Sequence, residues 1–266
     1  MAASGAGLLD DNSRIFSANG ALTIDGLTLT GGRTTGTYDA GGAITSVQAV
    51  TVLNSTISGN STTAFGSYGG GVYARGDITV MNSTISGNST SGIATIGGGL
   101  ASGGIVTVTN STISGNSTAG DDASGGGVFA LALTVINSTI TGNSTAGQRA
   151  NGGGVFAIGG ATVAESTISG NSARGDNVSG GGVYAGLDVS VANSIVLGNA
   201  SAGAGAEVFE YFGGTLNDGL IQITGDNIIG ADPGAFDVSQ TAGSGVVRNA
   251  AAADVFAATE GNNGVA

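Results

Sequence analysis

Residues 82–88 read Asn-Ser-Thr-Ile-Ser-Gly-Asn, and this seven-residue motif returns along most of the chain. Further copies begin at Asn54, Asn110 and Asn137, and two variant copies begin at Glu165 and Asn193. Successive copies lie 28, 28, 27, 28 and 28 residues apart. A repeat of this length, sustained over most of a chain, is typical of a solenoid in which each coil packs on its neighbours.

The residues around the motif alternate between apolar and polar, which indicates strands. Ile78, Val80 and Ile85 are expected to point inward, whereas Thr79 and Thr84 point outward. A second landmark is a glycine triplet followed by an apolar residue, at Val72, Leu100, Val128, Val155 and Val183. We predict a right-handed parallel β-helix, with three short strands in each coil of about 28 residues and about 4.8 Å between coils.

The repeat divides one predicted domain, residues 1–266, into four parts. These are an N-terminal cap or partial coil (1–19), regular coils (20–200), an irregular last coil (201–235) and a C-terminal cap or the start of a further region (236–266). A short helix is expected within 249–260, and the irregular coil carries a loop with Glu207, Glu210, Tyr211 and Phe212. We expect the chain to be part of a longer protein.

Composition narrows the classes of function. The net charge is −12, all six basic residues are arginines, and histidine and cysteine are absent. A nucleic-acid partner is therefore not expected, and neither a Ser-His-Asp triad nor a histidine-ligated metal can form. The chain shows neither a signal peptide nor an apolar run of membrane-spanning length, so direct membrane insertion is not expected.

The repeated asparagines have a structural interpretation and a chemical one. We predict two inward ladders of stacked amides, one formed by Asn54, Asn82, Asn110, Asn137 and Asn193, the other by Asn60, Asn88, Asn116, Asn143, Asn171 and Asn199. Glu165 interrupts the first ladder, and its orientation stays open. The Asn-Ser-Thr triplets also match glycosylation sequons, but we favour the ladders.

Several phrases resemble a known group of proteins. Residues 22–32 (Leu-Thr-Ile-Asp-Gly-Leu-Thr-Leu-Thr-Gly-Gly), the Asn-Ser-Thr-Ile-Ser-Gly-Asn motif, Gly-Gly-Gly-Val-Tyr-Ala and residues 226–230 (Asp-Asn-Ile-Ile-Gly) look like secreted bacterial right-handed β-helix repeat proteins, in the style of polymorphic outer-membrane proteins. The resemblance covers about residues 20–235. It implies a secreted or surface location and an adhesive or structural role, and it brings no catalytic residues.

One pair of carboxylates is compatible with an enzyme. Asp121 and Asp176 each lie four residues before a glycine triplet, so they occupy equivalent corners two coils apart, about 9.6 Å. Inverting glycosidases place their carboxylates at roughly 6.5–9.5 Å. Arg149 in the intervening coil and Asp122 beside Asp121 favour a charge-compensated surface cluster instead. No cofactor is expected, although these aspartates could contribute oxygens to a structural calcium ion.

Two outward rows are candidate binding surfaces. The first is a hydroxyl ladder of paired columns, formed by Thr56 and Ser58, Thr84 and Ser86, Thr112 and Ser114, Thr139 and Thr141, and Thr167 and Ser169, with Thr28 and Thr30 before them. Such an array is similar to the Thr-x-Thr faces of ice-binding solenoids. A column from Thr23 to Thr162 resembles it, which favours ordinary outward threonines.

The second is an aromatic row formed by Tyr73, Phe129, Phe156 and Tyr184, with Ala101 as a gap. The rings face out if Val72 and Ala74 point inward, and an inward aromatic stack is the alternative. Outward rings would suit a glycan or a protein surface.

The sequence as a whole favours a non-catalytic, extracellular scaffold or adhesive module of a larger bacterial protein. An ice- or glycan-binding solenoid is the alternative, followed by a polysaccharide-degrading enzyme that uses Asp121 and Asp176. The expected partners are ice, a glycan or another surface protein.

Overall fold

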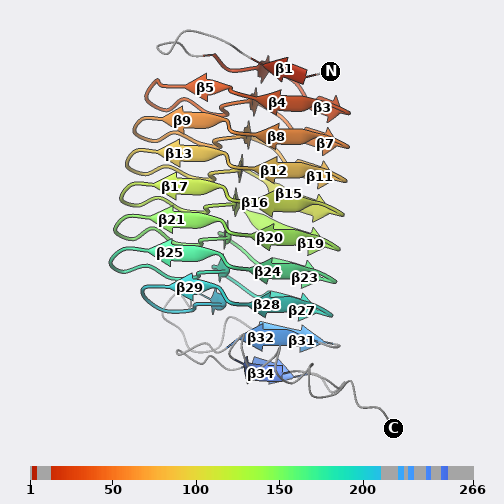
Figure 1. Cartoon of the computed structure of the whole chain (residues 1–266), viewed down its shortest axis with the longest axis vertical. Coiled ribbons are helices and arrows are strands. Elements are labelled where there is room, and N and C mark those ends of the chain that lie inside the picture. Colours follow the sequence, from red (N-terminus) through yellow and green to blue (C-terminus); the bar gives the residue numbers. More distant parts are fainter. Residues whose placement is uncertain are drawn as a thin grey trace, which may run out of the picture.

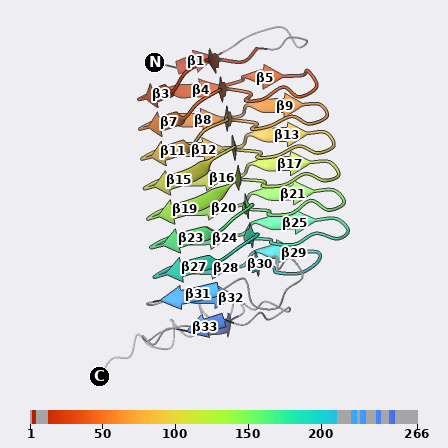
Figure 2. The same cartoon turned by 180° about the vertical axis from the view of Figure 1, so that it is seen from behind.

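The computed structural model of the chain describes residues 2–4, 13–210, 221–224, 227–230, 238–240 and 247–250. Every regular element in these residues is a β-strand, and all strand pairing is parallel between successive coils. Figure 1 shows the coils stacked along one axis, and Figure 2 shows the same stack from behind. The predicted parallel β-helix with coils of about 28 residues is confirmed.

Two sheets contain the strands on either side of the first Asn of the motif. Sheet C comprises β3 (Leu22–Asp25), β7 (Val50–Leu53), β11 (Ile78–Met81), β15 (Ile105–Thr109), β19 (Ala132–Ile136), β23 (Ala161–Ala164), β27 (Val189–Ala192), β31 (Ile221–Thr224) and β33 (Val238–Gln240). Sheet A comprises β1 (Ala2–Ser4), β4 (Thr28–Thr30), β8 (Thr56–Ser58), β12 (Thr84–Ser86), β16 (Thr112–Ser114), β20 (Thr139–Thr141), β24 (Thr167–Ser169), β28 (Ile195–Leu197), β32 (Ile228–Gly230) and β34 (Val247–Ala250).

The strands that follow the glycine triplets form sheet B. Its members are β2 (Phe16–Ala18), β6 (Ile44–Ser46), β10 (Val72–Ala74), β14 (Leu100–Ser102), β18 (Val128–Ala130), β22 (Val155–Ala157), β26 (Val183–Ala185) and β30 (Val208–Glu210).

A fourth sheet, sheet D, follows the second Asn of the motif and was not predicted. It comprises β5 (Arg33–Thr34), β9 (Ser61–Thr63), β13 (Ser89–Ser91), β17 (Ser117–Ala119), β21 (Ser144–Ala146), β25 (Ser172–Arg174) and β29 (Ala200–Ser201). The alternation of apolar and polar residues does not reveal these strands, because their inward residue is usually a threonine, such as Thr90.

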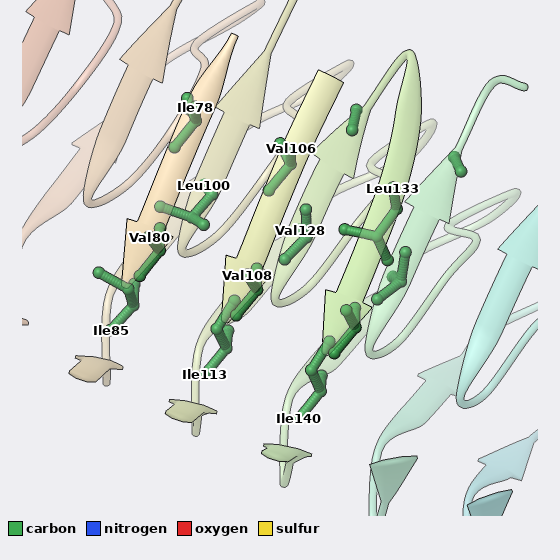
Figure 3. Packing of buried hydrophobic residues seen from close by; sticks show 14 of the residues in the cluster. Ile78, Val80, Ile85, Leu100, Val106, Val108, Ile113, Val128, Leu133 and Ile140 are labelled. Atoms are coloured by element: carbon green, nitrogen blue, oxygen red, sulfur yellow. The ribbon is translucent and has the colours of Figure 1, made fainter. Parts of the chain in front are cut away.

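The core is a stack of aliphatic side chains that repeats from coil to coil. Ile78, Val80, Ile85 and Leu100 have no exposed surface, and Figure 3 shows the equivalent residues of the next coils lying beside them. Burial of such side chains contributes about 1.5–3 kcal/mol each. The inward residues predicted from the alternation are thus confirmed.

The glycine triplets are needed because neighbouring backbones approach closely. A Cβ atom on Gly126 would lie 2.3 Å from the carbonyl oxygen of Gly153 and 2.4 Å from that of Ser144. Any side chain at this position would therefore push the next coil away.

The second of the two predicted asparagine ladders lies inside the solenoid. Asn116 donates from Nδ2 to Oδ1 of Asn143 and to the carbonyl oxygen of Ile85, each at 2.9 Å. Its own Oδ1 accepts from the backbone N–H of Asn88 at 2.9 Å and from Asn88 Nδ2 at 3.0 Å. The same pattern runs from Asn60 to Asn199, and these amides are buried. This prediction is confirmed.

The inner ladder ends on a carboxylate. Glu207 occupies the position that is the third glycine of a triplet in earlier coils, so its side chain reaches the place of the next ladder residue. It accepts from Asn199 Nδ2 at 2.6 Å, from the backbone N–H of Asn199 at 3.2 Å and from that of Gly198 at 2.9 Å. The side chain is only 4% exposed. Glu207 thus belongs to the interior of the last regular coil.

The prediction of the first ladder is wrong in its direction. Asn82 and its equivalents have a positive φ, 50° for Asn82, and are exposed. Their amides do stack, since Asn82 donates to Asn54 at 3.3 Å, but they do so on the outside. Asn54 donates in turn to Asp25 at 2.8 Å, so this outer ladder also ends on a carboxylate.

Serines take the inward place at this corner. The Oγ of Ser111 accepts from the backbone N–H of Ser83 at 3.0 Å, and this buried ladder runs from Ser55 to Ser194. Glu165, which interrupts the outer ladder, is exposed with φ of 52°, so it points outward.

The structure describes only some of the residues for which we predicted a C-terminal helix and an irregular loop. Asn249 and Ala250 lie in β34, so the helix predicted for 249–260 does not begin there, and residues 251–260 lie outside the described residues. Tyr211 and Phe212 of the predicted loop also lie outside the described residues.

Candidate functional site

The aromatic row lies on the outer face of sheet B. Tyr73, Phe129, Phe156 and Tyr184 are half-buried, and each is flanked by a buried valine and a buried alanine. The flanking residues therefore point into the core and the rings point outward. This settles the alternative that the sequence left open.

The rings of this row stack on one another. Phe129 and Phe156 have centroids 5.3 Å apart with an interplanar angle of 2°, and Phe156 and Tyr184 are 4.5 Å and 7° apart. Phe209 extends the stack by one coil, at 5.1 Å from Tyr184. Each ring thus covers part of the face of the next, and the surface that a sugar ring would need is partly occupied.

The row is interrupted at Ala101. This residue has no exposed surface, and Tyr73 beyond it pairs instead with Tyr68, at 5.6 Å. The continuous aromatic stack is therefore the segment from Phe129 to Phe209, a span of four coils.

An apolar ridge adjoins this stack at the corner between sheets B and C. It consists of Leu131, Ile158 and Leu187, which are 48%, 52% and 54% exposed. Each follows a stacked aromatic residue by two or three positions, in three successive coils. The ridge was not predicted, because in sequence it is three isolated apolar residues that follow strands. Stack and ridge together form one apolar face.

The hydroxyl ladder lies on the outer face of sheet A. Its threonines and serines pair in register from β4 to β24, for example Thr84 with Thr112 and Ser86 with Ser114. From β8 to β24 they are half-buried on either side of a buried isoleucine, whereas in β4 Thr28 is exposed and the buried residue is Leu29. The column from Thr23 to Thr162 on sheet C is in register as well. The outer faces of sheets A and C thus both carry threonine columns paired in register from coil to coil.

The candidate catalytic carboxylates are exposed and lie at equivalent corners two coils apart, with Gln148 between them. The backbone N–H of Gln148 donates to Asp121 at 2.9 Å, and that of Arg149 donates to the carbonyl oxygen of Asp176, also at 2.9 Å. These corners are held by ordinary coil-to-coil hydrogen bonds.

Arg149 pairs with Asp122, the neighbour of Asp121. Its Nη2 lies 2.7 Å from one carboxylate oxygen and its Nε lies 2.5 Å from the other. The hydrogen bond from Arg149 lowers the pKa of the Asp122 carboxyl below its usual value. Within the described residues, no group of three or more acidic side chains is arranged to hold a metal ion. The charged corner is a compensated surface cluster.

Four of the eight Asn-Ser-Thr triplets are inaccessible to a glycosylating enzyme. Asn60, Asn88, Asn116 and Asn143 are buried and their Nδ2 atoms are engaged in the inner ladder. In the Asn-Ser-Thr triplets that begin at Asn54, Asn82, Asn110 and Asn137, the asparagine faces solvent.

A shallow groove of about 450 Å³ crosses the outer face of sheet C. It was not predicted from the sequence. Its lining residues come from β15, β19, β23, β27 and β31 and the residues just before them: Ile105, Ala132, Leu133, Thr134, Gly160, Ala161, Thr162, Asp188, Val189, Ser190 and Gln222.

No known protein family, curated protein or solved structure matches this chain. In the part of the chain that the structure describes, no helix is long and apolar enough to cross a membrane.

Proposed function

We propose that the chain is a non-catalytic scaffold and adhesive module, secreted or held at a cell surface, that binds its partner through the apolar face of sheet B. The observation that carries the proposal is the exposure of Leu131, Ile158 and Leu187 beside the stack of Phe129, Phe156 and Tyr184. Soluble proteins rarely leave a contiguous apolar surface in water unless it binds something.

The scaffold supports this face rigidly. The coils that carry Phe129, Phe156 and Tyr184 are joined to one another by four parallel sheets and by two buried side-chain ladders, one of serines and one of asparagines. A partner that docks on the face therefore meets side chains whose positions are already fixed, which lowers the entropic cost of binding. The resemblance to secreted bacterial β-helix repeat proteins favours the same role.

Beads coated with the purified chain test this proposal in a flow chamber, on alkyl-coated, hydroxyl-coated and mucin-coated surfaces. The triple variant Leu131→Ser, Ile158→Ser, Leu187→Ser is expected to lower attachment by about tenfold on the alkyl and mucin surfaces, because it removes exposed apolar anchors.

The matched control changes Met81, Ile136 and Ile195 to serine. Each of these residues is 38% exposed and lies away from the ridge. Equal attachment of the ridge variant and the control would overturn the proposal.

The hydroxyl ladder supports a second candidate function, the binding of ice. The observation that favours it is the unbroken register of outward hydroxyls over six strands of sheet A. An ice-binding chain would show thermal hysteresis that the variant Thr112→Tyr abolishes. Absence of hysteresis at millimolar protein would remove this candidate.

A further inference from the structure

We infer that the groove on sheet C binds a neutral oligosaccharide chain that lies along the solenoid axis. This inference concerns a different surface from the apolar face and does not depend on the proposed adhesive function.

The groove is formed where small residues follow larger ones in a column of outward positions, one from each successive coil, at the start of the sheet C strands. Ile105 and Asp188 are the first and last lining residues of this column and are exposed, whereas Ala132 and Gly160 between them are small. Gly160 cannot be enlarged without movement of the chain, since a Cβ atom there would lie 2.8 Å from the carbonyl oxygen of Asp188. The hollow is thus built into two successive coils.

A row of uncharged polar side chains runs along the groove. Thr134, Thr162, Ser190 and Gln222 supply one hydroxyl or amide per coil. Such a row is about 14 Å long at the spacing of parallel strands. None of these four side chains donates or accepts a hydrogen bond within the described protein, so their polar groups are available to a ligand. A ligand that uses all of them must be a chain with polar groups at regular intervals.

The electrostatics select a neutral chain. The groove is lined by the carboxylate Asp188 and by no arginine, in a protein whose net charge is −12. Nucleic acids and anionic polysaccharides would be repelled. The apolar surfaces of Ile105 and Ala132 lie close to the hydroxyl row, an arrangement that suits sugar rings, which carry both C–H faces and hydroxyl groups.

The backbone argues against a peptide in the same place. Strands β19, β23 and β27 are each paired on both sides, so the floor of the groove offers no free strand edge. Extended peptides usually gain their affinity from such an edge. Recognition here must come from side chains alone.

Titration calorimetry with cellohexaose, chitohexaose and maltohexaose, and with hexagalacturonate as the anionic probe, tests the inference on the full chain. We expect at least one neutral hexamer to bind and hexagalacturonate to bind at least about tenfold more weakly because of the net charge of −12.

Two variants locate the binding. Ala132→Phe fills the groove and is expected to abolish binding of the neutral hexamer, while Thr162→Val removes one hydroxyl and is expected to weaken binding by about three- to tenfold. Thr79→Val, in the same column but outside the groove, is the matched control and should leave affinity unchanged.

Circular dichroism before each titration confirms that the variants are folded. The inference is overturned if none of the neutral hexamers binds at millimolar concentration, or if the folded Ala132→Phe and Thr162→Val variants bind as the original chain does.

Discussion

Asn82 and Asn88 stand in nearly the same sequence, each followed by Ser-Thr, yet one lies on the surface and the other in the core. The difference is which residue adopts the left-handed conformation at the corner. At the first corner Asn82 itself has φ of 50° and its side chain turns outward. At the second corner Gly87 has φ of 60°, and the following Asn88 points inward. A glycine before the asparagine therefore decides whether its amide is buried.

The largest effect is expected at the inner ladder. Asn116→Ala removes two donors and an acceptor that serve Asn88, Asn143 and Ile85. Because the partners stay buried without hydrogen bonds, the variant should lose roughly 3–5 kcal/mol of unfolding free energy. Urea unfolding followed by circular dichroism measures this loss. A loss below about 1 kcal/mol would show that buried and exposed amides contribute alike.

A smaller loss is expected where the inner ladder ends. Glu207→Ala leaves Asn199 and the backbone N–H of Gly198 without an acceptor, and should cost roughly 2–4 kcal/mol. Glu207→Gln keeps one acceptor oxygen and should cost about half as much. The same urea titrations test the ordering, which would be contradicted if the Gln variant were the less stable one.

The outer ladder should tolerate change. Asn110→Gly loses exposed amide contacts but relaxes a residue with φ of 50°, so the unfolding free energy should stay within about 0.5 kcal/mol of its original value. Asn110→Val is the informative contrast, because a β-branched residue is strained at this φ. If the Gly variant lost as much stability as Asn116→Ala, the distinction between the two ladders would fail.

The smallest effect is expected for the exposed ion pair of Asp122 and Arg149. Because the pKa of Asp122 is lowered in the folded protein, the pair contributes stability above the usual carboxyl pKa of 3.8 and loses it as pH falls through the lower folded value. Removal of Arg149 as Arg149→Gln should raise the pKa of Asp122 toward 3.8 and lower thermal stability at neutral pH only slightly, because the pair is exposed to solvent. NMR titration of the Asp122 side chain and a melting curve check both statements.

Most of the fold was predictable because its signals repeat in every coil. The inward residues Ile78, Val80 and Ile85 and the inner ladder through Asn88 follow from the alternation and from the glycine before the asparagine. The outer ladder could not be placed by alternation alone. Met81 and Asn82 both face outward, so the inward positions step from Val80 to Ser83 by three residues instead of two.

The candidate sites were harder to predict from the sequence than the fold was. The aromatic row was found, but its direction required the positions of Val72 and Ala74 relative to the core. The apolar ridge and the groove arise from side chains in different coils, and the groove depends on the small size of Ala132 and Gly160 beside larger neighbours. A repeat pattern predicts what the coils share, whereas these sites are made by how individual coils differ.

The two amide ladders also bear on how the length of such a protein can change. The inner amides donate toward the C-terminal end and stop at Glu207, whereas the outer amides donate toward the N-terminal end and stop at Asp25. A carboxylate accepts and cannot donate, so each terminates a one-way row. Coils between Asp25 and Glu207 could therefore be duplicated or deleted as whole units while both terminators keep their partners, and the reach of the protein could be altered without redesign of its ends.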